Sequence, residues 1–118
     1  MQLLNDDTFS ATTQRSNQTV LVLFETDWSG YCQILLMILK KLETTFAKQI
    51  RFYNMDFEMN RNTATQFNIG RVPTILIFRN GELIERITGI QSQNDMAARL
   101  KKLVENPYYP DSESLSMK

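Results

Sequence analysis

Several residues on which catalytic and metal sites depend are scarce or missing in this chain. It has no histidine and one cysteine, Cys32, among 118 residues. Without histidine there is no Ser-His or Cys-His nucleophile pair and no histidine-ligated metal site. One cysteine provides neither an internal disulfide nor the thiolate set of a zinc or iron–sulfur site. The sequence therefore indicates no metal and no other cofactor, and the lack of an internal disulfide fits a reducing compartment.

Charge and hydropathy exclude further classes of protein. The 13 basic and 13 acidic residues give a formal net charge of zero, and no basic cluster is interleaved with aromatic residues. We therefore expect neither nucleic-acid binding nor charge-driven attachment to a membrane. The longest apolar run, at 34–39, is too short to span a bilayer, and residues 1–7 lack the features of a signal peptide. Together these patterns predict a cytoplasmic protein.

Turn and capping residues divide the chain into alternating helices and strands. Asn80-Gly81 is a strong signal for a two-residue hairpin, so the last two strands are expected to be antiparallel. A helix between the first two core strands is typical of a parallel crossover. Helices are predicted at 6–15, 30–48, 60–67 and 92–105, and strands at 20–24, 50–55, 74–78 and 82–88, with a short first strand at 2–4 as a possible addition.

This order of elements predicts a single α/β domain over residues 1–105. Its mixed sheet has four to five strands, with helices on both faces. Asp6 or Asp7 is expected to cap the first helix and Asn60 the third. The remaining segment, 106–118, is rich in proline and serine and is expected to be a flexible tail.

The long helix at 30–48 is apolar on nearly all sides. Residues at helical spacing predict its buried stripe: Ile34, Leu35, Ile38, Leu42 and Phe46. Leu36 and Met37 extend the apolar surface beyond that stripe. They belong either to the core, which we favour, or to an interaction patch.

The turn before this helix carries the candidate catalytic residues. It reads Asp27-Trp28-Ser29-Gly30-Tyr31-Cys32 and follows the apolar strand at 20–24. A strand, a tight turn and a helix start, with a tryptophan and a cysteine at the turn, is a typical setting for thiol-disulfide exchange. That chemistry needs two thiols three positions apart, one to attack a disulfide and one to release the mixed disulfide. Ser29 and Cys32 hold these two positions, so only one of the two thiols is present.

Several features in register make the chain resemble the thioredoxin family over about 6–105. Trp28 precedes the turn, and Cys32 occupies the second-cysteine position of the family motif. Pro73 lies 41 residues beyond Cys32 and opens a strand, as the family's cis-proline segment does. Asn80-Gly81 makes the next hairpin, and Gly89 ends its second strand. The resemblance implies a thioredoxin-like fold.

The resemblance also implies a substrate groove beside the turn. In this family the cis-proline segment exposes unpaired backbone, to which an extended peptide can add as a strand. The residues expected to line the groove are Trp28, Gly30, Tyr31, Val72 and Pro73. Trp28 and Tyr31 are either substrate-facing aromatics or half-buried residues without a binding role.

The departures from the family pattern bear directly on activity. Ser29 replaces the attacking cysteine, and Tyr31 replaces the usual proline. Leu23 stands where family members commonly bury an aspartate that serves the second cysteine, and we align Phe52 with the lysine that accompanies that aspartate. The loss of both titratable groups favours a natural departure from dithiol catalysis over an engineered Cys-to-Ser variant of a disulfide reductase.

Opposing influences act on Cys32 and Ser29. The N–H groups and dipole of a helix start favour a thiolate at Cys32, whereas burial against Leu23 and Phe52 disfavours ionisation. We expect burial to dominate, so Cys32 should react slowly with alkylating agents at neutral pH. Ser29 is expected to be an N-cap residue, because no base is present to activate its hydroxyl group.

These observations lead to two main hypotheses. The first is a monothiol protein of cytoplasmic thiol redox homeostasis, which acts through Cys32 and is a poor dithiol reductase. The second is a non-catalytic, chaperone-like module that binds a peptide in the groove around Trp28, Tyr31 and Pro73. In both cases the expected partners are proteins with a cysteine or an extended segment. We expect a monomer that can form a Cys32-linked dimer on oxidation.

Overall fold

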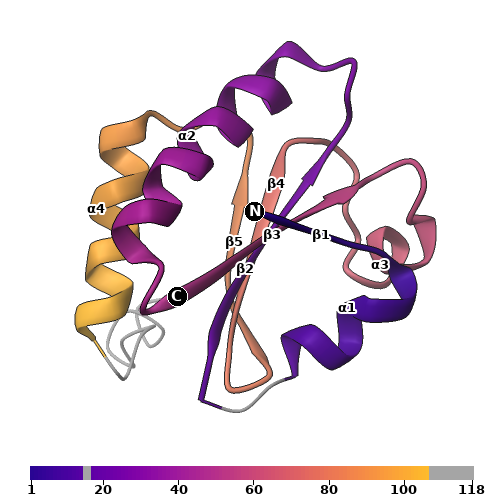
Figure 1. The fold of residues 1–118 in the computed structure, drawn as a ribbon. Helices are drawn as coiled ribbons and strands as arrows, with labels where there is room; N and C mark the ends of the chain where they lie inside the picture. The colour runs from indigo at the N-terminus through magenta and orange to yellow at the C-terminus, as the bar shows by residue number, and fades with distance from the viewer. Residues whose placement is uncertain (15–16, 107–118) are drawn as a thin grey trace, which may run out of the picture.

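A computed structural model describes residues 1–14 and 17–106 (Figure 1). Its strands are β1 (Gln2–Leu4), β2 (Thr19–Glu25), β3 (Ile50–Asp56), β4 (Thr74–Arg79) and β5 (Glu82–Thr88). Its helices are α1 (Asp6–Thr13), α2 (Gly30–Phe46), α3 (Arg61–Gln66) and α4 (Gln93–Glu105). The elements follow the predicted order, and β1 is present as the fifth strand. Apart from its first residue, the predicted tail lies outside the described residues.

The strands form one mixed sheet in the order β1-β3-β2-β4-β5. β1 and β2 both pair with β3 in parallel, β4 pairs with β2 antiparallel, and β5 pairs with β4 antiparallel. The prediction of an α/β fold with a mixed sheet is confirmed. Because β2 is central and apolar throughout, its residues 20–24 are fully buried.

Helices cover both faces of the sheet, as Figure 1 shows, with α2 and α4 on one side and α1 and α3 on the other. Side chains alternate along β2. Leu21 and Leu23 pack in the core that contains residues of α2 and α4, whereas Val22 and Phe24 pack in the core on the opposite face. This alternation assigns each β2 side chain to one helical layer.

The buried stripe of α2 differs from the predicted one. The buried residues are Cys32, Leu35, Leu39, Leu42 and Phe46. Ile34 is 46% exposed and Met37 is 56% exposed, so the predictions that these two are core residues are wrong. Successive helical residues are about 100° apart, so a stripe that starts at Cys32 turns Ile34 away from the sheet. Leu36 and Ile38 lie at its margin and are partly buried.

Side-chain caps also differ from expectation at two helices. Asn5, rather than Asp6 or Asp7, caps α1, and its side chain accepts hydrogen bonds from the N–H groups of Asp7 and Thr8. Asp6 instead accepts hydrogen bonds from the backbone and hydroxyl of Thr63 in α3. Asn60 makes no capping bond. Its Oδ1 accepts from Asp6 N and its Nδ2 donates to the carbonyl of Asp56. Asp6 and Asn60 therefore join α1 and α3 to each other.

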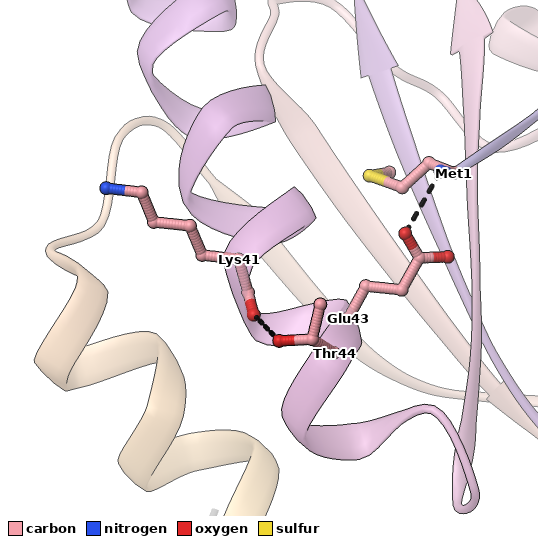
Figure 2. Close-up of polar contacts among 4 residues, drawn as sticks. All are labelled: Met1, Lys41, Glu43 and Thr44. Carbon is pink, nitrogen blue, oxygen red and sulfur yellow. Dashed lines mark hydrogen bonds and ion pairs between the residues drawn. The ribbon is translucent and has the colours of Figure 1, made fainter.

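Polar contacts also connect the start of the chain to α2 (Figure 2). The amino group of Met1 donates a hydrogen bond to Glu43 Oε1 at 3.0 Å and forms an ion pair with it. One residue along, Thr44 Oγ1 donates to the carbonyl of Lys41 at 2.7 Å. The contact between Met1 and Glu43 holds the beginning of β1 close to the C-terminal half of α2.

Candidate functional site

The candidate residues gather where β2 ends and β4 begins. Phe24 and Thr74 are partners in the antiparallel pairing of these strands. The turn at 26–29, which follows β2, and the loop at 70–73, which precedes β4, therefore lie at the same end of the sheet. The peptide bond between Val72 and Pro73 is cis. The carbonyl of Pro73 accepts a hydrogen bond from Gly89 N at 2.9 Å. No described group bonds to the backbone N–H or carbonyl of Val72, whose residue is half-buried.

Ser29 is the N-cap residue of α2, as predicted. Its Oγ accepts a hydrogen bond from Cys32 N at 3.3 Å, and its carbonyl accepts from Gln33 N at 3.1 Å. Gly30 begins the helix, is exposed, and has open space around the position that a Cβ would occupy. The hydroxyl of Ser29 therefore acts as a hydrogen-bond acceptor in a helix cap, and no described base is bonded to it.

Cys32 is a free thiol and is 0% exposed. It is the first member of the buried stripe of α2, which continues through Leu35 and Leu39. The predicted burial of this thiol is confirmed. Because this thiol is covered, a partner disulfide has to pass the residues of the first turn of α2 before it contacts the sulfur atom of Cys32.

The two aromatic residues of the turn are exposed. Trp28 is 74% exposed and Tyr31 is 66% exposed, so neither belongs to the core. Trp28 Nε1 donates a hydrogen bond to Glu58 Oε1 at 2.7 Å. This contact was not predicted from the sequence. No local pattern connects two residues that lie 30 positions apart.

We expect the contact with Glu58 to hold the indole ring of Trp28 in place. In Glu58→Ala, the ring should reorient faster, which time-resolved fluorescence anisotropy can measure because Trp28 is the only tryptophan. Because the hydrogen bond is exposed, its loss should lower the free energy of unfolding by at most about 1 kcal/mol. Glu82→Ala, at an exposed position on β5, is the matched control. Unchanged anisotropy in Glu58→Ala would show that the bond does not restrain the ring.

The sheet register corrects one expectation about the surroundings of Leu23. Its partner on β3 is Asn54, whereas Phe52 pairs with Leu21. The alignment that placed Phe52 beside Leu23 is therefore wrong by two positions. Asn54 Nδ2 donates a hydrogen bond to Glu25 Oε2 at 2.7 Å. The sheet next to Leu23 consequently contains an amide and a carboxylate, not only apolar groups.

A metal cluster and a membrane-spanning helix are both absent from the described ranges, 1–14 and 17–106. They contain no group of three or more His, Cys, Asp or Glu side chains that could hold a metal ion. No helix within them is long and apolar enough to cross a membrane.

Sequence comparison places these features in a family. The family model for thioredoxin matches residues 1–102. The chain belongs to the thioredoxin family. Membership supports a thiol redox function in general terms, and the mixed five-stranded sheet with its helices is consistent with the thioredoxin fold.

Curated relatives agree with this assignment. The chain is 29% identical over 104 residues to the M-type chloroplastic thioredoxin of Pisum sativum, covering 88% of this chain and 60% of that protein. It is 28% identical to a thioredoxin of Mycobacterium tuberculosis, covering 87% of this chain and 89% of the relative. A thioredoxin of Acidithiobacillus ferridurans is 31% identical, with 82% of this chain and 90% of the relative covered. The chain thus spans less than two thirds of the pea protein but most of the two bacterial ones.

Proposed function

We propose that this thioredoxin-family protein acts in thiol redox homeostasis through one thiol, Cys32, in a reducing compartment such as the cytoplasm. The observation that carries the proposal is the retained cysteine in the first turn of α2, at the end of the sheet where the loop at 70–73 lies. Among residues 1–14 and 17–106, nothing forms a hydrogen bond with the backbone of Val72 in that loop. An extended segment of a partner can pair with that backbone and place its disulfide near the turn.

The exchange step replaces an S–S bond of the partner with an S–S bond to Cys32. The thiol of Cys32 loses its proton, and the thiolate attacks one sulfur of a partner disulfide. A new S–S bond forms to Cys32, the old S–S bond breaks, and the other sulfur leaves as a thiolate. Because Ser29 cannot attack the mixed disulfide, release requires an external thiol. The proposed monothiol protein therefore holds partners longer than a dithiol protein does.

A second candidate function is a non-covalent binding module. It is favoured by the exposure of Trp28 and Tyr31 together with the full burial of Cys32. Exposed aromatics supply apolar contact area, and a buried thiol does not hinder peptide binding. In this case the protein is a monomer at all redox potentials, whereas the monothiol proposal adds a Cys32-linked dimer on oxidation.

Capture of partners from a native extract separates the two proposals. With wild type, Cys32→Ser and Trp28→Ala as baits, the experiment is run with and without reductant. If the monothiol proposal is right, capture is seen only without reductant, and Cys32→Ser abolishes it. Trp28→Ala should then weaken capture without abolishing it. If Cys32→Ser retains the same partners under both conditions, the monothiol proposal fails and the binding module is supported.

A further inference from the structure

A polar hollow lies at the end of the sheet opposite the candidate functional site. Its volume is about 330 Å³, at the small end of the range for ligand pockets. Three segments line it: 17–19 at the start of β2, 47–49 in the turn after α2, and 50–51 at the start of β3. Cys32 is in the first turn of α2, whereas the hollow adjoins the last turn, so the proposed redox function makes no use of it.

Main-chain hydrogen bonds hold the walls of the hollow in place. Asn17 N donates to Asn80 Oδ1 at 3.0 Å, and Asn80 N donates to the carbonyl of Gln18 at 3.4 Å, so this wall is fixed to the hairpin of β4 and β5. On the other side, Gln49 N donates to the carbonyl of Phe46 at 2.9 Å and closes the turn after α2. Because these bonds use the main chain of 17, 18 and 49, the side-chain amides of the three residues remain available for a ligand.

Two cationic side chains line the hollow, and neither has a counterion among the described residues. Lys48 and Arg51 are exposed, and neither ion pair of the described chain includes them. No Asp or Glu is part of the lining. Glu43, which lines the adjoining hollow, is paired with the amino group of Met1 (Figure 2). The positive charge of the hollow is therefore not neutralised from within the described chain, and it favours an anionic ligand.

The neutral groups of the lining add hydrogen-bond donors and one unpaired acceptor. The amides of Asn17 and Gln49 can donate to an oxyanion. Thr19 Oγ1 accepts from Arg79 Nε at 3.4 Å, so its own hydrogen can also point to a ligand. Gln18 Oε1 is buried, and no described group donates to it. Because an unpaired buried carbonyl is costly, a ligand that carries a hydroxyl group beside its negative charge suits this lining best.

We propose that this hollow binds a small phosphate ester, with the phosphate group against Lys48 and Arg51 and a hydroxyl group of the ester donating to Gln18. The planar guanidinium group of an arginine matches two phosphate oxygens, and a lysine adds a compact charge. A phosphate ester carries close to two negative charges at neutral pH, so it balances both cations, whereas a carboxylate balances one. The site is separate from the thiol and goes beyond the proposed redox function.

The test is a titration of the isotope-labelled full chain with glycerol 3-phosphate, followed by NMR. Saturable chemical-shift changes are expected at the backbone amides of 17–19 and 48–51, and none at those of 30–32 beside the thiol. Lys48→Gln and Arg51→Gln should each weaken binding by about tenfold, because each removes a hydrogen bond to a charged group. Both side chains are exposed, so both variants should fold.

Matched controls test each part of the proposal. Lys40→Gln removes an exposed charge of α2 outside the lining and should change the affinity by less than about twofold, because solvent and salt screen it. Inorganic phosphate, which has no alcohol group, should bind several-fold more weakly than the ester, and Gln18→Leu should remove this difference.

Two results would overturn the proposal. Shifts that grow without saturation, or an equal loss of affinity in Lys40→Gln and Lys48→Gln, would indicate general ion screening and no site. Equal binding of inorganic phosphate and of the ester by the wild type would refute recognition of an ester. The titration involves neither Cys32 nor a protein partner, so its result is independent of the capture experiment.

Discussion

Replacing Ser29 by cysteine is expected to convert a poor disulfide reductase into an active one. The wild-type protein should reduce insulin disulfides in the presence of dithiothreitol at close to the background rate, because it has one thiol and no resolving partner for it. Ser29 lies three positions before Cys32 and its Oγ is already bonded to Cys32 N. A cysteine at position 29 would place its sulfur close to Cys32. It would lie at the N-terminal end of α2, where backbone N–H groups favour a thiolate.

The expected gain is at least about tenfold over background in the insulin assay, together with an internal disulfide that mass spectrometry detects after oxidation. Ser29→Ala is the matched control. It removes the same cap hydroxyl, at a cost of about 1 kcal/mol of stability, and adds no thiol, so it should stay at background. A folded Ser29→Cys protein that forms the disulfide but reduces no insulin would show that the groove does not present substrates for exchange. High activity of the wild type would refute the monothiol proposal.

The arrangement of helices and strands could be predicted from the sequence because its signals are local and strong. The apolar segment at 20–24 is long enough for a central strand, Asn80-Gly81 specifies a tight hairpin, and Ser29 and Ser92 mark helix starts. Both serines accept the backbone hydrogen bonds expected of N-caps. The parallel crossover and the antiparallel hairpin follow from these connections, whereas the pairing of β4 with β2 was not predicted. The turn at Trp28–Cys32 could be recognised for the same reason.

Contacts that depend on register or on three-dimensional packing could not be predicted in this way. Asn5 competes with Asp6 and Asp7 for the cap of α1, and the choice depends on Thr63, which binds Asp6 from another helix. The pairing of Leu23 with Asn54 is a property of the sheet register. A two-residue error in that alignment hid the contact between Asn54 and Glu25. The contact of Trp28 with Glu58 has the same long-range character.

The exposed side of α2 shows why an apolar pattern alone does not define a core. Ile34 and Leu35 are neighbours of similar size in the same helix, yet Ile34 is 46% exposed and Leu35 is 0% exposed. Leu35 packs between α2 and the sheet with Leu21 and Leu23. A helix with apolar residues all around gives several possible stripes, and only contact with the sheet selects one.

Because of this difference in burial, substitution of Leu35 by alanine should lower the free energy of unfolding much more than substitution of Ile34. Leu35→Ala should lower the free energy of unfolding by about 2–5 kcal/mol, because it removes buried contacts and leaves a cavity. Ile34→Ala should change it by less than about 1 kcal/mol, since the side chain is half in solvent and alanine is the better helix former. Urea unfolding followed by circular dichroism measures both variants under the same conditions.

If Ile34→Ala were as destabilising as Leu35→Ala, Ile34 would have to be buried in solution, against a partner or a second copy of the chain. Unfolding at several protein concentrations separates these cases, because burial against a second copy makes the midpoint depend on concentration.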